Sequence, residues 1–500
     1  MNENQRLVSV QNRTHLSIRQ LAVFVLSLLI VGAMVLTNQR NNAIVESEVA
    51  PVPVMPFASL DQRISTSWFC PGVPGNDGTI SGTIIISNPS DADFNATVTR
   101  LGVGVAPVVT AVTVVARSQA AVNVKEGIES AFISTIVEIL GGVGTAEQFI
   151  NHPAGNSVAQ CANEPATDWY FADGFTGADS LNHIVLTNPY SDSTVVDVAF
   201  VTKESTREPS RLHGFVIPPR SVVALNMADE GARNEPVVAV EVHASAGKLV
   251  VGRSQHYLGD GRLGYTMALG VSGASSEWWF AGGEKLEGST EQLVILNPDR
   301  NDATLSVMFV NGTNPEAQIE PAILTAPAGR VTLFDTGALP NLPNGRYGII
   351  VSTIGEPGVT APGVVIEQVV NRRVGNTVGT SVVLGAPMGA TSTVWVAPSG
   401  VSSGIDDAML ILNATPVEGT FTVSQIGPAG EVAIAGLESI LLPASGLVSV
   451  PVPAGIPNGE IVVRSTIPVV VQRMLLRGHD LTGRSAVLAL PTVPSPEVSP

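Results

Sequence analysis

Short apolar runs recur along most of the chain, and turn-forming residues separate them. The runs are rich in Val, Ile and Thr, whereas Gly, Pro, Asn and Asp gather between them. This alternation is typical of β-strands joined by tight turns. Residues 128–140 read locally as a helix, but their second half, TIVEIL, takes the place of a strand in the repeats that follow. The pattern therefore predicts an all-β fold over most of the chain.

One unit of this strand pattern occurs four times. The segments SWFCPG, DWYFADG, EWWFAGG and TVWVAPSG each precede, by about 20 residues, an apolar run that ends in Asn. These asparagines are Asn88, Asn188, Asn297 and Asn413, which lie 100, 109 and 116 residues apart. Each unit closes with Gly-x-Ser/Thr before a last strand. Because the aromatic segment and the apolar run ending in Asn recur together in four copies, they indicate tandem repeats over residues 67–166, 167–275, 276–391 and 392–491.

Each repeat has room for about seven short strands, which predicts an immunoglobulin-like antiparallel sandwich. Propeller blades of about 40–50 residues are shorter than these repeats, so we do not expect a propeller. The links between repeats are short. A strand of about 7–10 residues spans about 25–33 Å, which sets the length of each repeat. The sequence therefore predicts four sandwiches in a row, extending on the order of 100 Å.

The motif Asp168-WYFADGFTG, followed by IVLTNP and a proline turn, resembles repeat domains of unknown function in secreted and cell-surface proteins of actinobacteria. The resemblance spans residues 67–491 and is weakest in repeat four, where Asn413-Ala414 replaces Asn-Pro. It implies an extracytoplasmic β-rich protein and supplies no catalytic residues.

The N-terminus has the pattern of a membrane anchor. Residues 20–39 carry no charge, and Arg6, Arg13 and Arg19 precede them. About 20 apolar residues span a bilayer, and the positive flank is retained inside the cell. We therefore expect a single-pass cell-membrane protein with its bulk outside; a cleaved signal peptide is the alternative. The predicted order is a cytoplasmic segment over 1–20, a transmembrane helix over 21–39, a Pro-rich tether over 40–66, the repeats, and a Pro-rich tail over 492–500.

Charge supports this division of the chain. The sequence has 26 Lys and Arg against 43 Asp and Glu, a net charge of −17. Residues 1–40 contain four Arg and one Glu, so they carry +3 and the remainder carries −20. An acidic exported part argues against nucleic acid as a partner, because phosphate binding needs clustered Lys and Arg.

The two cysteines both fall in repeat one, Cys70 on its first strand and Cys161 on its last. First and last strands can be neighbours in a sandwich, and thiols outside the membrane become oxidised. We therefore predict a Cys70–Cys161 disulfide. No Cys-x-x-Cys motif suggests redox catalysis.

Aromatic residues mark the first strand of every repeat. Strand alternation places Trp68, Trp169 and Trp278 on one face. The opposite face is predicted to carry Phe69, Tyr170, Trp279 and Trp395. One face should fill the core, and the other either packs on the neighbouring repeat or is exposed for stacking on sugars.

Other candidate chemistry is weak. Gly400-Val-Ser402-Ser-Gly404 matches a hydrolase nucleophile motif, but a strand follows it where a helix is required. Acidic turns after the Asn-Pro positions could ligate calcium, although turn formation explains them as well. Histidines lack metal-ligand spacing, so no metal or cofactor is expected. Glu147, Glu367 and the aligned Gln148, Arg253, Gln368 and Arg473 either line an inter-domain contact or lie on solvated edges.

Together these features predict a non-catalytic, membrane-anchored envelope protein that acts as a spacer, scaffold or adhesion element. The expected partners are other envelope proteins. A cell-wall glycan-binding protein that uses the strand aromatics is the alternative, and an enzyme is a distant third.

Overall fold

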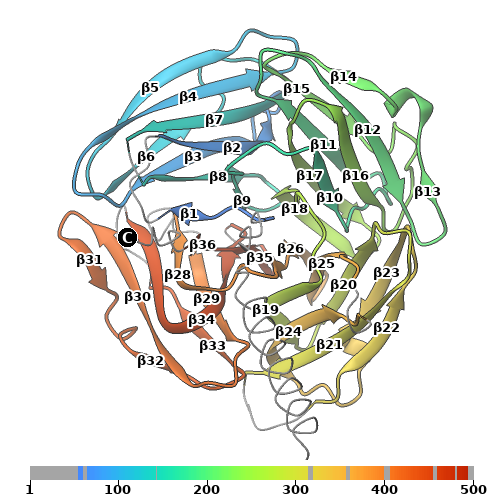
Figure 1. Cartoon of the computed structure of the whole chain (residues 1–500), viewed down its shortest axis with the longest axis vertical. Coiled ribbons are helices and arrows are strands. Elements are labelled where there is room, and N and C mark those ends of the chain that lie inside the picture. The colour runs from blue at the N-terminus through green and yellow to red at the C-terminus, as the bar shows by residue number, and fades with distance from the viewer. Residues whose placement is uncertain are drawn as a thin grey trace, which may run out of the picture. The chain divides into compact units, whose positions relative to one another are not determined.

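Each sequence repeat folds as two antiparallel β-sheets packed face to face (Figure 1). The computed structural model describes residues 54–59, 65–141, 143–312, 319–355, 361–398, 406–453, 459–478 and 481–493. The described residues contain strands and two short 3-10 turns but no α-helix. The all-β prediction is confirmed, including the strand over TIVEIL, which lies in β7.

The first strand of each repeat lies in one sheet, here called the first-strand sheet, and the closing strand lies in the other, the axial sheet. In repeat one these have the orders β2-β7-β4-β5 and β6-β3-β8-β9. The strands of repeat one are β2 (Ser65–Pro74), β3 (Ser81–Asn88), β4 (Phe94–Gly102), β5 (Val108–Val114), β6 (Ser118–Asn123), β7 (Phe132–Leu140), β8 (Thr145–Asn151) and β9 (Ser157–Gln160).

Repeats two and three follow the same plan. Repeat two contains β10 (Asp168–Phe171), β11 (Leu181–Asn188), β12 (Thr194–Val201), β13 (Thr206–Arg207), η1 (Ser210–Leu212), β14 (Phe215–Ile217), β15 (Ser221–Asn226), β16 (Ala239–Ala246), β17 (Val250–Gly259) and β18 (Arg262–Leu269). Repeat three contains β19 (Glu277–Lys285), β20 (Ser289–Asn297), β21 (Ala303–Asn311), β22 (Ala322–Ala326), β23 (Arg330–Asp335), η2 (Thr336–Ala338), β24 (Gly345–Thr353), β25 (Val365–Val374), β26 (Thr377–Leu384) and β27 (Ala386–Pro387).

Repeat four differs in one long strand that serves both of its sheets. The strand β34 pairs with β28 and β30 through its first half and with β29 and β35 through its second half. The strands of this repeat are β28 (Ser392–Ala397), β29 (Asp406–Asn413), β30 (Gly419–Gly427), β31 (Gly430–Ala433), β32 (Ile440–Leu442), β33 (Gly446–Pro451), β34 (Glu460–Leu476), β35 (Arg484–Leu488) and β36 (Leu490–Val493).

The strand order is not that of an immunoglobulin domain. In that fold the first two strands of the domain share a sheet. Here β2 pairs with β7, whereas β3 lies in the opposite sheet between β6 and β8. The sandwich expectation therefore holds at the level of two packed sheets, and the immunoglobulin connectivity does not.

The asparagine repeated in all four units ties the two sheets together at one end. The Asn88 side-chain amide donates to the carbonyls of Ala92 and Val114, and its carbonyl accepts from the Ser90 backbone N–H. Asn188, Asn297 and Asn413 make the corresponding three contacts. A buried side chain that satisfies three backbone groups explains why Asn recurs at this position.

The repeats form a closed ring and not a row. Residues 53–500 are one compact unit, in which the sheets of the four repeats follow one another around a central axis (Figure 1). Apolar clusters run across each junction: Leu101 and Phe132 of repeat one pack with Val185 of repeat two, and Val396 and Ile426 of repeat four lie in the core of repeat one. The predicted extended row is therefore wrong for this unit. The radial stacking resembles a propeller in which each repeat supplies two blades, so repeat length alone could not exclude it.

The closing strands β9, β18, β26 and β35 meet at the axis. Close approach there requires glycine in the Gly-x-Ser/Thr motifs. Gly264 has φ +127°, and a Cβ added to it would lie 1.7 Å from Nη2 of Arg477. The Arg477 guanidinium, from repeat four, donates to the carbonyls of Ala154 in repeat one and Thr380 in repeat three. One side chain of repeat four thus touches all three other repeats.

The chain preceding repeat one completes the ring. Val54 and Met55 lie against the axial strands around a cavity of about 50 Å³. The backbone of Phe57 exchanges hydrogen bonds with the Asn163 side chain, at 2.8 and 3.0 Å. The strand β1 (Ala58–Ser59) then pairs in parallel with β36, the last strand of repeat four. The segment before repeat one is therefore built into repeat four.

Candidate functional site

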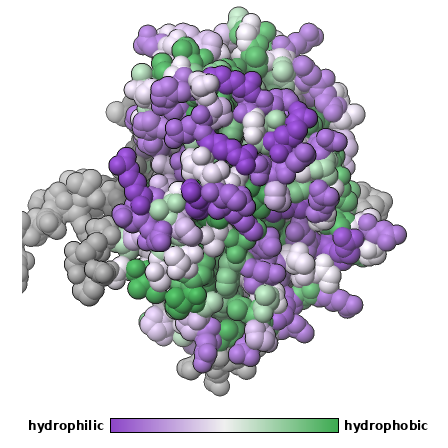
Figure 2. Space-filling view, turned by 90° about the vertical axis from the view of Figure 1, so that its right-hand side faces the viewer, coloured by the Kyte–Doolittle hydropathy of each residue, from purple (hydrophilic) through white to green (hydrophobic). Residues whose placement is uncertain are grey.

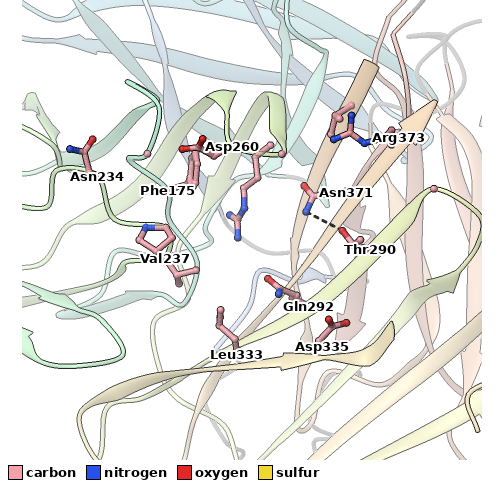
Figure 3. A pocket seen from close by; sticks show the side chains of 16 residues that line it. Phe175, Asn234, Val237, Asp260, Thr290, Gln292, Leu333, Asp335, Asn371 and Arg373 are labelled. Atoms are coloured by element: carbon pink, nitrogen blue, oxygen red, sulfur yellow. Dashed lines mark hydrogen bonds between the residues drawn. The ribbon is translucent and has the colours of Figure 1, made fainter. Parts of the chain in front are cut away.

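A cavity of about 680 Å³, lined by both polar and apolar side chains, lies at the junction of repeats two and three. This volume falls within the range of about 300–1,000 Å³ that is typical of ligand pockets, which often form between domains. Repeat two contributes the loop before β11, the loop before β16 and the hairpin between β17 and β18. Repeat three contributes side chains of β20, β23, β25 and β26. Figure 3 shows these two sets of side chains facing each other across the space.

Several polar side chains of the cavity have no hydrogen-bond partner among the described residues. They are Asn234 and Asp260 from repeat two and Arg373 from repeat three, which are exposed to solvent, and Gln292 from repeat three, which is half-buried. Asn371 is held by neighbours instead, because its amide donates to Thr290 and its carbonyl accepts from Thr380 (Figure 3). The cavity therefore presents both donors and acceptors that are accessible from solvent.

Arg262 forms part of the inner wall of the cavity and is almost buried, with 6% of its surface exposed. Its Nη1 donates to both carboxylate oxygens of Asp173 at 3.0 Å. Its guanidinium carbon lies 5.2 Å from the ring centre of Phe175 and 5.8 Å from that of Tyr257. Burial lowers the pKa of Arg262, but Asp173 and Tyr257 together outweigh burial and raise it. The charge is therefore fixed, and Nε and Nη2 have no hydrogen-bond partner among the described residues.

A buried ion pair locks the two repeats together behind this cavity. Arg253 of β17 donates from Nη1 and Nη2 to the Glu367 carboxylate of β25, at 2.9 and 2.8 Å. Glu367 also accepts the backbone N–H of Asp173 at 2.7 Å. The Arg253 and Glu367 side chains are 0% and 2% exposed. Burial lowers the pKa of Arg253, but Glu367, Tyr257 and Asp173 together outweigh burial and raise it.

The same arrangement recurs on the opposite side of the ring. Arg473 of β34 donates to Glu147 of β8 at 2.6 and 2.9 Å, and it also pairs with Asp406. Even repeats thus supply the arginine and odd repeats the glutamate. The sequence pointed to these positions but allowed two interpretations, an inter-domain contact or a solvated edge. The structure shows the contact.

Two buried carboxyl groups have strongly shifted pKa values. Burial raises the pKa of Glu460 to about 7, and this residue of repeat four accepts a 2.6 Å hydrogen bond from Thr145 of repeat one. Burial also raises the pKa of Glu291 to about 7, although Tyr347 and Gln368 donate to it. Apolar surroundings disfavour the charged form of both groups. The Glu460 contact thus joins repeats four and one through a carboxyl group whose pKa lies near neutrality.

The predicted disulfide is confirmed. Cys70 and Cys161 are bonded, and both are buried in the core of repeat one. The bond joins β2 to the segment after β9, so it staples the first-strand sheet to the end of the axial sheet.

The strand aromatics lie inside the molecule and at its junctions. Phe69 packs on the cluster shared by repeats one and two, and Tyr170 on the cluster shared by repeats two and three. Trp279 is 8% exposed and lies in the cluster shared by repeats three and four. Trp395 is fully buried, and its Nε1 donates to Val469 as that of Trp278 does to Val364.

Trp395 therefore occupies the core position of Trp278 and not the face predicted for it. Val396 takes that face instead, since it pairs with Leu490 as Trp279 pairs with Ala386. In repeat four the strand pairing is offset by one residue from the sequence alignment of the repeats. An offset of one residue moves every side chain to the opposite face of the strand.

The remaining sequence candidates contribute no site within the described ranges. Ser402 and its Gly-x-Ser-x-Gly motif lie outside the described residues. No group of three or more His, Cys, Asp or Glu side chains that could hold a metal ion occurs in the described part of the chain. His152 and His256 do meet, with ring centres 4.8 Å apart, at the junction of repeats one and two. Burial and His256 lower the pKa of His152 to about 4.

Among the residues described, no helix is long and apolar enough to cross a membrane. The predicted anchor over residues 21–39 lies outside the described residues. On the face shown in Figure 2, hydrophilic side chains predominate and apolar ones form separate patches.

Comparison with known proteins gives a family but no function. No curated protein matches the sequence. A solved tetra-tandem repeat from the extending region of a large adhesion protein is 12% identical over 81% of this chain and 93% of that chain. Its TM-score of 0.08 is too low to indicate a shared fold. A model of a family of unknown function, DUF5719, matches residues 145–397, which is just over half of the chain. The chain therefore belongs to the DUF5719 family.

Proposed function

We propose that this protein is a membrane-anchored, non-catalytic scaffold on the outer side of the cell membrane, held by residues 21–39 and contacting other envelope proteins. The closed ring is the observation that supports this role best. A row of sandwiches would act as a spacer, whereas a ring returns its last strand to its first and forms a broad, rigid platform.

Rigidity follows from the way in which the junctions are built. Neighbouring repeats share continuous apolar clusters, and two junctions also contain buried, bidentate arginine–glutamate contacts. Such contacts leave little freedom for one repeat to swing against the next. A rigid surface suits a protein that positions its partners, because less conformational entropy is lost on binding.

The outward orientation is tested by lysine labelling. The sequence has only four lysines, all between residues 125 and 285, and Lys203 and Lys248 of repeat two are exposed. Intact cells are treated with a membrane-impermeant amine reagent, and the two sites are read by mass spectrometry. We expect labelling without lysis. Labelling only after lysis would place the ring inside the cell and contradict the proposal.

The scaffold role is tested by cross-linking the full-length chain in intact envelopes. We expect the same envelope proteins to be recovered in independent preparations. The Glu367→Gln variant, which removes a buried contact between repeats, should recover less of them at equal expression. Recovery of no envelope protein by the wild-type chain would contradict a scaffold.

A further inference from the structure

The cavity between repeats two and three has the features of a binding site, and the scaffold role does not use it. Its walls come from two repeats whose positions are fixed by the contact of Arg253 with Glu367. Glu367 binds the backbone of Asp173, and Asp173 in turn holds Arg262 of the cavity wall. The lining is therefore held in place before any ligand arrives, as an effective site requires.

The unused polar groups fit hydroxyl groups. A hydroxyl donates one hydrogen bond and accepts others. Asp260 offers only acceptors, Arg373 only donors, and Asn234 and Gln292 offer both. Gln292 is half-buried in the wall, and the other three side chains are exposed to solvent, so all four can reach a ligand in the cavity. Arg262 adds its Nε and Nη2 donors from the inner wall. A ligand with many hydroxyls would satisfy such a mixed set.

The cavity also has an apolar side. Phe175 and Val237 lie on the wall from repeat two, and Leu333 lies on the wall from repeat three (Figure 3). A sugar ring presents C–H groups on its faces and hydroxyls at its edge. Aromatic and aliphatic side chains beside hydrogen-bonding groups match this division.

The net charge of the cavity lining favours an uncharged ligand over an anion. The side chains Arg262 and Arg373 are balanced by Asp260 and Asp335 in the lining, and Asp173 already neutralises Arg262. A phosphate or carboxylate site would need an excess of positive charge. The lining is neutral to slightly acidic and therefore favours an uncharged ligand.

We infer that the cavity between repeats two and three binds a neutral saccharide. This inference goes beyond the scaffold role and does not depend on it. It also replaces the sugar-stacking alternative drawn from the sequence, because Trp279 and Trp395 are buried. The site is formed by loops and strands of two repeats and not by the strand aromatics.

The test is titration calorimetry of the full-length chain, solubilised in a detergent without a sugar headgroup. The probes are the tetrasaccharides of maltose, cellulose, mannan and chitin, with inorganic phosphate and a phosphorylated hexose as anionic probes. We expect at least one neutral tetrasaccharide to bind with a Kd of about 1 mM or lower. The Gln292→Ala variant should weaken that binding by about tenfold, because it removes an amide from the wall of the site.

The matched control is Thr83→Ala. Thr83 precedes Asn88 by five residues, as Gln292 precedes Asn297, but it lies in repeat one away from the cavity. It should leave binding unchanged. The inference is overturned if no neutral tetrasaccharide binds, if only the anionic probes bind, or if both variants behave as the wild type. A blocking variant, Thr290→Trp, should abolish binding while leaving the thermal unfolding temperature near that of the wild type.

Discussion

Replacing Glu367 by Gln tests the idea that buried charges hold neighbouring repeats together. Gln keeps the shape and an oxygen that can still accept the Asp173 N–H, now bonded at 2.7 Å. It removes the negative charge opposite Arg253, whose side chain has no exposed surface. The guanidinium is then left buried beside a neutral amide.

The expected cost follows from this geometry. Removing one partner of a buried ion pair costs about 3–5 kcal/mol, because the other charge loses its compensation while still excluded from water. A domain is stable by only about 5–15 kcal/mol, so the loss is large. An exposed pair provides the comparison: Arg464 and Glu431 make two 2.7 Å contacts, but their side chains are 48% and 29% exposed. Glu431→Gln should cost about 1 kcal/mol or less.

The assay is urea unfolding of the full-length chain, with the free energy of unfolding compared between variants. A double variant, Arg253→Met with Glu367→Gln, should recover more than half of the loss, since neither charge remains buried. If Glu367→Gln costs no more than Glu431→Gln, the buried pair does not stabilise the junction and the reasoning fails.

Three further predictions concern the disulfide, the pH dependence of stability and the glycine at the ring axis. Replacing Cys70 and Cys161 by Ser should lower the free energy of unfolding by about 4–5 kcal/mol in the loop-entropy account; an unchanged urea midpoint would argue against the bond. The pKa of Glu460 is raised to about 7, so its contribution is complete below its unfolded pKa and is lost as the pH rises through 7. Glu460→Gln should therefore stabilise the chain at pH 8 but not at pH 4, and equal effects at both would contradict this. Gly264→Ala should cost about 2 kcal/mol or more in thermal melts, because its Cβ would overlap the guanidinium at the axis; Gly261→Ala, with open space around its Cβ, should cost less.

The sequence was sufficient to predict the parts of each repeat. Strands, turns and the four copies follow from local pattern, and the Cys70–Cys161 bond followed from the strand order together with the predicted compartment. The predicted face of Trp395 was wrong because it came from an alignment of residue types, whereas the face of a strand residue is decided by the pairing register. The register is set by the pairing of β28 with β34 and β36, which joins segments far apart in the sequence.

Ring closure could not be read from local pattern. The glycines at the axis looked like ordinary turn residues, and the two residues of β1 gave no strand signal. One signal was available: on corresponding strands the odd repeats carry Glu147 and Glu367, and the even repeats carry Arg253 and Arg473 one position further along. Opposite charges on corresponding strands of successive units favour a contact between the units. The cavity between repeats two and three comes from side chains on separate strands and loops, so no linear motif marks it.

The central claim is that repeat four lies beside repeat one, and a spin-label distance between them tests it most directly. Val115 of repeat one and Val432 of repeat four are 57% and 55% exposed, and both native cysteines are bonded to each other, so labels on introduced cysteines are selective. Arg117 lies 3.8 Å from the Cβ position of Gly430, which places the two labelled segments side by side. The ring predicts a label separation below about 35 Å, given about 3.5 Å per residue of chain and the label arms. Sandwiches in a row would separate repeats one and four by about 75–100 Å, and a distance in that range would contradict the ring.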